Sequence, residues 1–557
     1  MKRIYQLIIG LAFIALVPTG CHKLDVPVDS QLTPEVYPTT LAQFNSVMGP
    51  IYTRLRNDWA VNHFQITSHS SDESVQPAYG GNWFDGGRFM QLHYHTWDKD
   101  NPLVNSEWMY WSDMVGISNQ IMYILGTAPE GAAKNQALAE MRTMRALAYF
   151  MMMDLFGNVP IDTVYGSKEL QTNTPRAQVF TFVENELKNA IPFLSTQGGA
   201  VMYGKPNRYV ASALLAKMYL NAQVYIGTPK WNEAIAACDD VINAGGGTLY
   251  GFEPRATYLQ MFYPNNGPQH KEFIMAIPYD AATSSGWQFH ARYDLNRNLG
   301  IRYRYSGATR GTNVNPIMNL TTGNGLVNVR PSGPRMTLPE YFAYFNDPND
   351  VRNGQWLSGK QYWEDGSPIR VRTTKRGYDQ FYTGSDGGAE YIYDLELSSG
   401  FSLRQNPLTF DCGNDEIAWN MGTRNIKFFP DWTNVSNRNQ NNDIPVIRYS
   451  DIILMKAEAI LRGGSPTLGH TALGLVNSLR ANRTTSPAWT TVNLENIYAE
   501  RARELAWECW RRNDMIRFGK FEDSYGLKTD ANPQKRIFPI PNAAFQVNPR
   551  LVQNPGY

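Results

Sequence analysis

The sequence predicts a mostly α-helical protein, in which helix pairs of the tetratricopeptide kind form a scaffold and a long, irregular, loop-rich insertion with short strands interrupts it. Apolar residues recur every three or four positions in the first and last parts of the chain, which is the spacing of an amphipathic helix. Between Gly245 and Asp443 this spacing disappears. Glycine, asparagine, aspartate, tyrosine and arginine dominate there, around isolated strand-like runs such as Phe273 to Ile277.

One predicted helix pair, at residues 208–225 and 231–243, gives the array its tetratricopeptide character. Its aromatic and small residues approximate the positions that such a repeat uses: Leu215, Tyr219, Trp231, Ala234, Cys238 and Val241. The joining loop is longer than usual and the repeat is degenerate. The pattern therefore favours an α-α array of this type.

The beginning of the chain has the pattern of a secretory signal. Lys2 and Arg3 precede an apolar run from Ile4 to Val17, and a small residue then precedes Cys21. This order is typical of a bacterial lipoprotein, in which the cysteine carries a diacylglycerol and becomes the first mature residue. The alternative is a free or disulfide-bonded Cys21.

These patterns divide the chain into three parts. We expect residues 1–20 to be a signal peptide, residues 21–40 a lipidated tether and residues 41–557 a single domain. Within that domain the helical scaffold covers approximately residues 41–244 and 443–557, and the irregular insertion approximately residues 245–442.

Charge and composition exclude several classes of partner. The formal net charge is +1, and removal of residues 1–20 takes away Lys2 and Arg3 and no acidic residue, which leaves −1. We therefore expect no nucleic-acid partner and no electrostatic membrane surface. The remaining cysteines, Cys238, Cys412 and Cys509, have no ligand-like spacing and are interpreted as buried hydrophobic residues.

Helical periodicity places further elements along the chain. The expected helices span residues 41–55, 107–125, 134–156, 176–191, 208–225, 231–243, 448–462, 471–480 and 494–518. Residues 71–100 have no helical period and are interpreted as a long functional loop. The last helix has a wide apolar stripe with charged residues at ion-pairing intervals, Glu508 to Arg511 and Asp514 to Arg517, so we interpret it as a salt-bridged structural helix.

Four segments carry a resemblance to a known family. They are AEMRTMRALAYFMMMDLFGNVPI (Ala139 to Ile161), DIPVIRYSDIILMKAEAILR (Asp443 to Arg462), ERARELAWECWRRNDMIRFGK (Glu500 to Lys520) and the terminal LVQNPGY. Together and in this order they resemble the motifs of the SusD/RagB family of surface glycan-binding lipoproteins. The resemblance implies about four helix pairs, an outer-membrane lipoprotein facing the cell exterior, and a SusC-like TonB-dependent transporter as partner.

The sequence contains no complete motif of the common enzyme classes that we considered. Residues 354–360 match most of a phosphate-binding loop, but Gln361 stands where a serine or threonine must reach magnesium. His93 and His95 lack further ligands, so we interpret them as ordinary loop residues and expect no metal and no cofactor. Glycoside hydrolysis stays open, because its two carboxylates leave no fixed spacing in a sequence.

Aromatic rings in polar, glycine-rich loops are the candidates for a binding surface, because rings stack on sugar C–H groups. Those with the least apolar company are Trp83, Phe84, Trp97, Trp287, Tyr293, Tyr305 and Trp356. By resemblance, the family binds glycan on an arc of aromatic residues from the 71–100 loop and the later irregular region. The predicted glycan-binding residues are therefore Asp72, Trp83, Asp85, Arg88, Trp97, Trp287, Tyr293 and Trp356.

Three functions remain in competition. The first is a non-catalytic lipoprotein that binds glycan and delivers it to the transporter. The second is a surface glycoside hydrolase, and the third is a helical-repeat scaffold whose ligands are proteins. Release of reducing ends separates the first two, and retardation in glycan affinity gels separates the first from the third.

Overall fold

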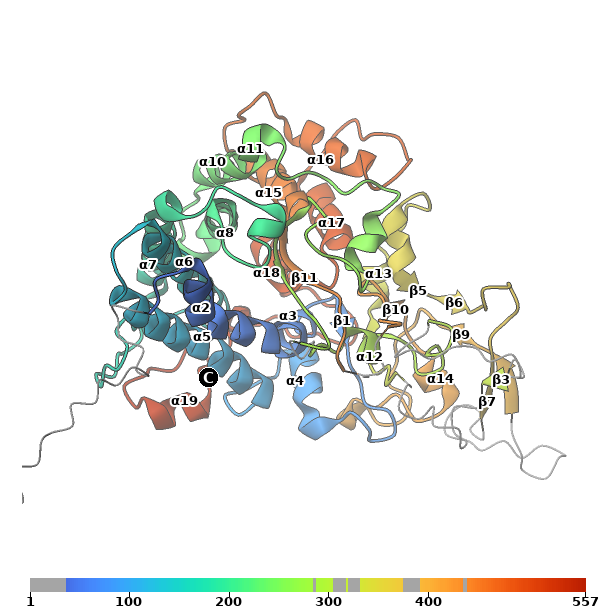
Figure 1. Ribbon diagram of the computed structural model, residues 1–557. Helices are drawn as coiled ribbons and strands as arrows, with labels where there is room; N and C mark the ends of the chain where they lie inside the picture. Colours follow the sequence, from blue (N-terminus) through green and yellow to red (C-terminus); the bar gives the residue numbers. More distant parts are fainter. Residues whose placement is uncertain (1–36, 284–286, 304–316, 319–330, 374–390, 434–437) are drawn as a thin grey trace, which may run out of the picture.

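A computed structural model describes residues 37–283, 287–303, 317–318, 331–373, 391–433 and 438–557. The long helices gather on one side of the molecule, and most of the short strands lie on the other side together with the short helices α12 to α14 (Figure 1). Cys21 and Tyr305 lie outside the described residues.

The helices of the first half are α2 (Leu41–Asp58), α3 (Phe64–Ser68), α4 (Arg88–Tyr94), α5 (Pro102–Gly126), α6 (Ala132–Phe156), α7 (Arg176–Ala190), α8 (Arg208–Leu220), α9 (Ala222–Ile226), α10 (Trp231–Ile242) and α11 (Ala244–Gly247). Those of the second half are α12 (His290–Asp294), α13 (Pro339–Phe342), α14 (Glu416–Trp419), α15 (Tyr449–Leu461), α16 (Ala472–Ala481), α17 (Leu494–Glu504), α18 (Arg511–Arg517) and α19 (Asn542–Val547).

The scaffold helices pack one on the next. Helix α5 packs on α6, α6 on α7, α7 on α8, α8 on α10, α10 on α15, and α15 on both α16 and α17. Helix α10 shows why the sequence gives this arrangement, because Ala234, Ile235, Cys238 and Val241 form one buried face at helical spacing. The predicted fold class, a helix-pair array with an irregular insertion, is confirmed.

The strands are short and lie mostly in the insertion. They are β1 (Ser74–Val75), β2 (Phe273–Ile277), β3 (Ile317–Met318), β4 (Met336–Thr337), β5 (Trp356–Leu357), β6 (Gly359–Lys360), β7 (Arg370–Thr373), β8 (Tyr391–Asp394), β9 (Glu396–Leu397), β10 (Arg424–Asn425) and β11 (Ile444–Arg448). Pairs β1–β4, β5–β10, β6–β9 and β2–β11 are antiparallel, and β3, β7 and β8 form a three-stranded sheet. Strand β2, which the sequence predicted, joins the insertion to β11 beside the scaffold.

Buried ion pairs tie the insertion to the scaffold. Arg352, in the insertion, pairs with Asp350 at 2.6 Å, with Glu500 at 2.8 Å and with Glu504 at 3.0 Å, and both glutamates lie on α17. Arg448 also reaches Glu504, at 2.7 Å. Because each charge has several partners, the network satisfies groups that burial would otherwise penalise heavily.

The single helix predicted for residues 494–518 is wrong in its middle. Helix α17 ends at Glu504 and α18 begins at Arg511, and between them Trp507 and Cys509 have φ angles of 64° and 69°. The cause is tertiary, since the Trp507 backbone N–H donates to the carboxylate of Glu73 at 2.6 Å. The apolar residues do have helical spacing, but the Glu73 carboxylate, which is distant in the sequence, takes the Trp507 N–H that a continuous helix would use.

The charged residues around this break behave partly as predicted. Asp514 pairs with Arg517 at 2.7 Å. Glu508 instead pairs with Lys427 and Arg448, at 2.6 Å each. The structural interpretation holds, although the break redirects Glu508 away from α18.

Candidate functional site

Four aromatic rings form a continuous row on the irregular side of the molecule. The ring centroids of Trp83 and Tyr293 are 5.0 Å apart, those of Tyr293 and Phe289 4.7 Å, and those of Phe289 and Trp287 5.0 Å. Trp287 is 37 % exposed, Trp83 and Tyr293 are partly exposed, and Phe289 is buried between them. We call these four residues the aromatic row. It contains three of the predicted site residues, and Phe289 is the member that sequence reasoning missed.

The loop that carries Trp83 is held in an unusual backbone conformation. The backbone N–H groups of Gly80 and Gly81 donate to the carboxylate of Asp411 at 2.8 and 2.7 Å. Trp83 and Asp85 follow with φ angles of 68° and 47°, in the left-handed region that bulky residues seldom adopt. Such strain persists only where the surroundings enforce it, and it is concentrated at functional sites.

Tyr293 and Phe289 are mounted on and beside the short helix α12. The Tyr293 N–H donates to the carbonyl of Phe289 at 2.8 Å, and the Tyr293 carbonyl accepts from the Arg335 N–H at 3.0 Å. The Arg335 guanidinium is fully buried 5.1 Å from the Tyr293 ring and pairs with Asp294 at 3.2 Å. Burial lowers the pKa of Arg335, and Asp294 opposes that shift.

The polar residues predicted beside Trp83 form an ion pair. Arg88 donates to Asp85 at 2.7 Å, and both side chains are about one-third exposed. Arg88 opens helix α4, so the expectation of a loop without helix over residues 71–100 is wrong for residues 88–94. The helix forms because Phe89, Leu92 and His93 bury one face of it.

Three predicted site residues are buried elsewhere, and their assignment to an exposed surface is wrong. Trp97 is 0 % exposed and its indole N–H donates to the Tyr557 hydroxyl at 2.8 Å. Trp356 is 8 % exposed and packs edge-on against Trp507. Asp72 is 7 % exposed and is covered by Arg511, to which it is bonded twice at 2.6 Å.

The residue after Asp72 is also buried. Glu73 accepts hydrogen bonds from the Ser68 hydroxyl and the Trp507 N–H, both at 2.6 Å. Burial raises the pKa of Glu73 to about 7, and these two hydrogen bonds oppose the rise. Ser71, Asp72 and Glu73 therefore form a buried structural centre that joins the first part of the chain to the last.

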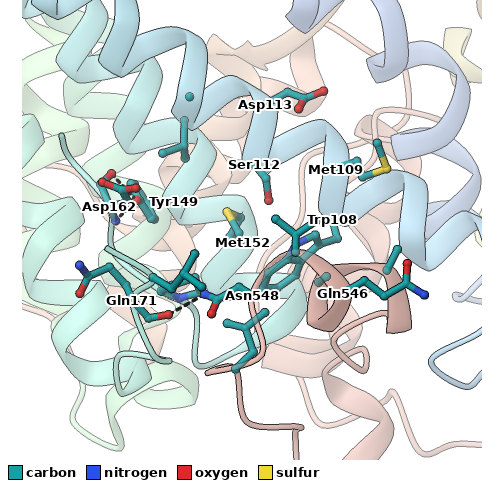
Figure 2. Close-up of a pocket in the computed structure, with 18 of the residues that line it drawn as sticks. Trp108, Met109, Ser112, Asp113, Tyr149, Met152, Asp162, Gln171, Gln546 and Asn548 are labelled. Atoms are coloured by element: carbon teal, nitrogen blue, oxygen red, sulfur yellow. Dashed lines mark hydrogen bonds between the residues drawn. The ribbon is translucent and has the colours of Figure 1, made fainter. Parts of the chain in front are cut away.

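A separate groove of about 570 Å³ lies between α5, α6, the segment after α6 and α19 (Figure 2). Trp108, Met109, Met152 and Val547 give it an apolar lining. Two of its polar groups are bonded within the protein: the Tyr149 hydroxyl donates to the carbonyl of Asp162, and the Asn548 amide to that of Gln171. The aromatic rings that line the groove, Trp108 and Tyr149, are 7 % and 1 % exposed, so they offer little ring face for a sugar to stack on, and the aromatic row is the better glycan candidate.

Two further properties concern the described part of the chain only. No helix there has both the length and the apolar character of a membrane span. No group of three or more histidine, cysteine, aspartate or glutamate residues is arranged there to hold a metal ion. His93 is buried among aromatic rings, and burial lowers its pKa to about 3.

The fold and the row define a helical scaffold with an irregular insertion, in which the insertion and the Trp83 loop together carry an aromatic surface. Two family profiles match the chain, one described as the SusD family over residues 271–536 and one as "Starch-binding associating with outer membrane" over residues 24–220. The chain belongs to the SusD/RagB family.

Individual relatives agree. The chain is 25 % identical to the starch-binding protein SusD of Bacteroides thetaiotaomicron over 503 residues, which cover 85 % of this chain and 82 % of that protein. It is 24 % identical to the SusD-like protein P25 of Formosa agariphila, over 76 % of this chain and 74 % of that one. A laminarin-binding SusD-like protein has the same fold, with a TM-score of 0.64 at 21 % identity, over 93 % of this chain and 99 % of that one.

Proposed function

We propose that this protein is a non-catalytic, cell-surface lipoprotein of the outer membrane that binds glycan on the aromatic row and delivers it to a SusC-like TonB-dependent transporter. The observation that carries the proposal is the row itself, which presents Trp83, Tyr293 and Trp287 to solvent beside the hydrogen-bonding pair Asp85 and Arg88. Ring faces stack on sugar C–H groups, and charged side chains bond hydroxyl pairs.

The relatives support the ligand class and the location. One is named a starch-binding protein and another a laminarin-binding one, and one matching family is described as associating with the outer membrane. The lipid anchor would be Cys21. The transporter and the delivery step rest on the family resemblance.

The acids beside the row support a binding role over hydrolysis. Asp85 is paired with Arg88, and Asp294 is 2 % exposed and paired with Arg335. A glycosidase needs two carboxyl groups about 5 to 10 Å apart that both reach the scissile bond. We therefore expect no release of reducing ends from any polysaccharide that the protein binds, and such release would favour the hydrolase.

The test removes one ring of the row and, in parallel, one ring of the core. Trp83→Ala should weaken glycan binding by about 1 kcal/mol, roughly fivefold, because a stacking partner is lost. The loop should retain its conformation, because Asp411 still accepts hydrogen bonds from the backbone N–H groups of Gly80 and Gly81. The measurement is retardation in affinity gels that contain the glycan found by screening a panel.

Trp97→Ala is the matched control. Its ring is fully buried, so truncation should reduce the free energy of unfolding by about 3 to 5 kcal/mol while the folded fraction binds glycan normally. Wild-type affinity in folded Trp83→Ala would show that the site lies elsewhere. Failure of every glycan to retard the wild-type protein would leave the protein-binding scaffold as the better function.

A further inference from the structure

An exposed arginine lies over one end of the aromatic row. The guanidinium carbon of Arg438 is 5.5 Å from the centroid of the Trp287 ring. Its backbone is held in place, because the Arg438 carbonyl accepts from the Gln288 N–H at 3.1 Å and Asn439 forms a β-bridge with Trp287. The Arg438 side chain is solvent-exposed, so its guanidinium lies beside the Trp287 ring at the protein surface, where a ligand can reach both.

A second arginine lies at the middle of the row. Arg292 precedes Tyr293 on α12, and its guanidinium carbon is 6.0 Å from the Tyr293 ring centroid. Its carbonyl accepts from the N–H groups of Ser332 and Gly333 at 2.7 and 3.0 Å, which fixes the backbone. Within the described residues its Nε is buried without a hydrogen-bond partner.

The charges around the row are unbalanced. Asp85 is engaged by Arg88, and Asp294 by Arg335 at 3.2 Å. In the described part of the chain no carboxylate lies within salt-bridge distance of Arg292 or Arg438. A guanidinium keeps its charge at every physiological pH, and its planar donors match a carboxylate or sulfate in a bidentate arrangement.

We propose that the aromatic row selects acidic oligosaccharides, with the rings stacking on the sugar and Arg292 and Arg438 bonding its carboxylate or sulfate groups. The inference rests on the proposed function and adds the ligand class. A neutral glycan would leave both guanidinium groups without the partner for which their geometry is suited. The charge of the ligand would then discriminate between glycans that stack equally well.

The first experiment compares acidic polysaccharides with their own neutral derivatives. Polygalacturonate, alginate and carrageenan are placed in affinity gels beside their carboxyl-reduced or desulfated forms, with starch and laminarin as neutral glycans. We expect at least one acidic polymer to bind about tenfold more tightly than its neutral derivative, since a charge-assisted hydrogen bond is worth about 1.5 kcal/mol or more. The preference should weaken when NaCl is raised from about 0.05 to about 0.5 M. Comparison of the carboxylated polysaccharides with the sulfated one shows which anionic group the protein binds.

The second experiment removes the charges. Arg438→Gln should reduce binding of the acidic polymer about tenfold and leave its neutral derivative unchanged, whereas Trp287→Ala should weaken both. Arg292→Lys keeps a charge but loses the bidentate geometry, and it should cause a smaller loss for the acidic polymer alone. Arg550→Gln, at an exposed arginine near the C-terminus, is the matched control and should change neither.

The outcomes separate this inference from the proposed function. Suppose that a neutral glycan binds, that Trp83→Ala weakens this binding, and that Arg438→Gln changes binding of the acidic polymer and of its neutral derivative to the same extent. The proposed acidic ligand is then wrong, while glycan binding stands. If no acidic or neutral glycan retards the protein, both proposals fail.

Discussion

The pair formed by Asp72 and Arg511 gives the sharpest test, because the sequence assigned Asp72 to glycan binding and the structure assigns it to stability. Both carboxylate oxygens accept from the guanidinium at 2.6 Å, and the two residues are 7 % and 2 % exposed. Arg511 also lies 4.0 Å from the centroid of the Tyr498 ring. The guanidinium is therefore enclosed by one carboxylate and by aromatic rings.

Asp72→Asn should destabilise the protein strongly and leave glycan affinity unchanged. The substitution keeps the size of the side chain but removes the charge that compensates a buried cation. Breaking a buried pair in this way costs about 3 to 5 kcal/mol, because the remaining charge stays desolvated. The assay is chemical denaturation at pH 7 followed by circular dichroism, together with affinity-gel retardation of the folded variant.

Asp85→Asn is the matched control. Asp85 also pairs with an arginine, but both side chains are about one-third exposed, so the stability change should be at most about 1 kcal/mol. The reasoning is refuted if Asp72→Asn unfolds at the wild-type denaturant concentration and loses its glycan. That result would return Asp72 to the binding surface.

The remaining predictions concern a buried carboxyl group, the anchor and the partner. The pKa of Glu73 is raised to about 7 from 4.5, so its stabilising contribution is full below pH 4.5 and is lost as pH rises to about 7. The unfolding free energy of wild type minus that of Glu73→Gln should fall by about 3 kcal/mol across this window, and a flat difference would contradict the assignment. Cys21→Ala should abolish incorporation of labelled lipid and release the protein from membranes. Purification of the wild-type protein from its native cell in mild detergent should recover a β-barrel transporter in near-equal amount, and recovery of the lipoprotein alone would count against the partner.

Helices whose packing is set by their own spacing were predictable from the sequence. Residues 231–243 were assigned from the interval between small and aromatic residues, and α10 spans Trp231–Ile242. The interruption at residues 505–510 was not predictable, because the acceptor for the Trp507 N–H is Glu73, 434 residues away. The local spacing of apolar residues carries no information about a hydrogen-bond acceptor that only the folded structure brings close to the backbone.

The same limit explains which of the predicted rings lie at the surface. Trp287 lacks apolar neighbours in the sequence and is 37 % exposed in the structure. Trp97 has a similar local sequence, but Phe538, from the end of the chain, packs on it at 4.6 Å between ring centroids. Phe289 was missed because nothing in the sequence distinguishes a buried ring that joins two exposed rings from an ordinary core residue.

The aromatic row is mounted rigidly although its parts come from distant segments. The Trp83 loop is fixed by Asp411, and Trp287 is fixed by its bridge to Asn439. Beneath Tyr293 the chain of contacts continues into the scaffold, because Arg335 pairs with Asp294 and Asp294 accepts from the Trp507 indole at 3.1 Å.

This last contact gives the broken helix a role in the site. A continuous helix through residues 505–510 would give Trp507 a different backbone conformation from the left-handed one that places its indole beside Asp294. The break therefore connects the packed helices to the support of the row. Rings held in this way lose little conformational freedom when a ligand stacks on them, so more of the stacking energy remains for affinity.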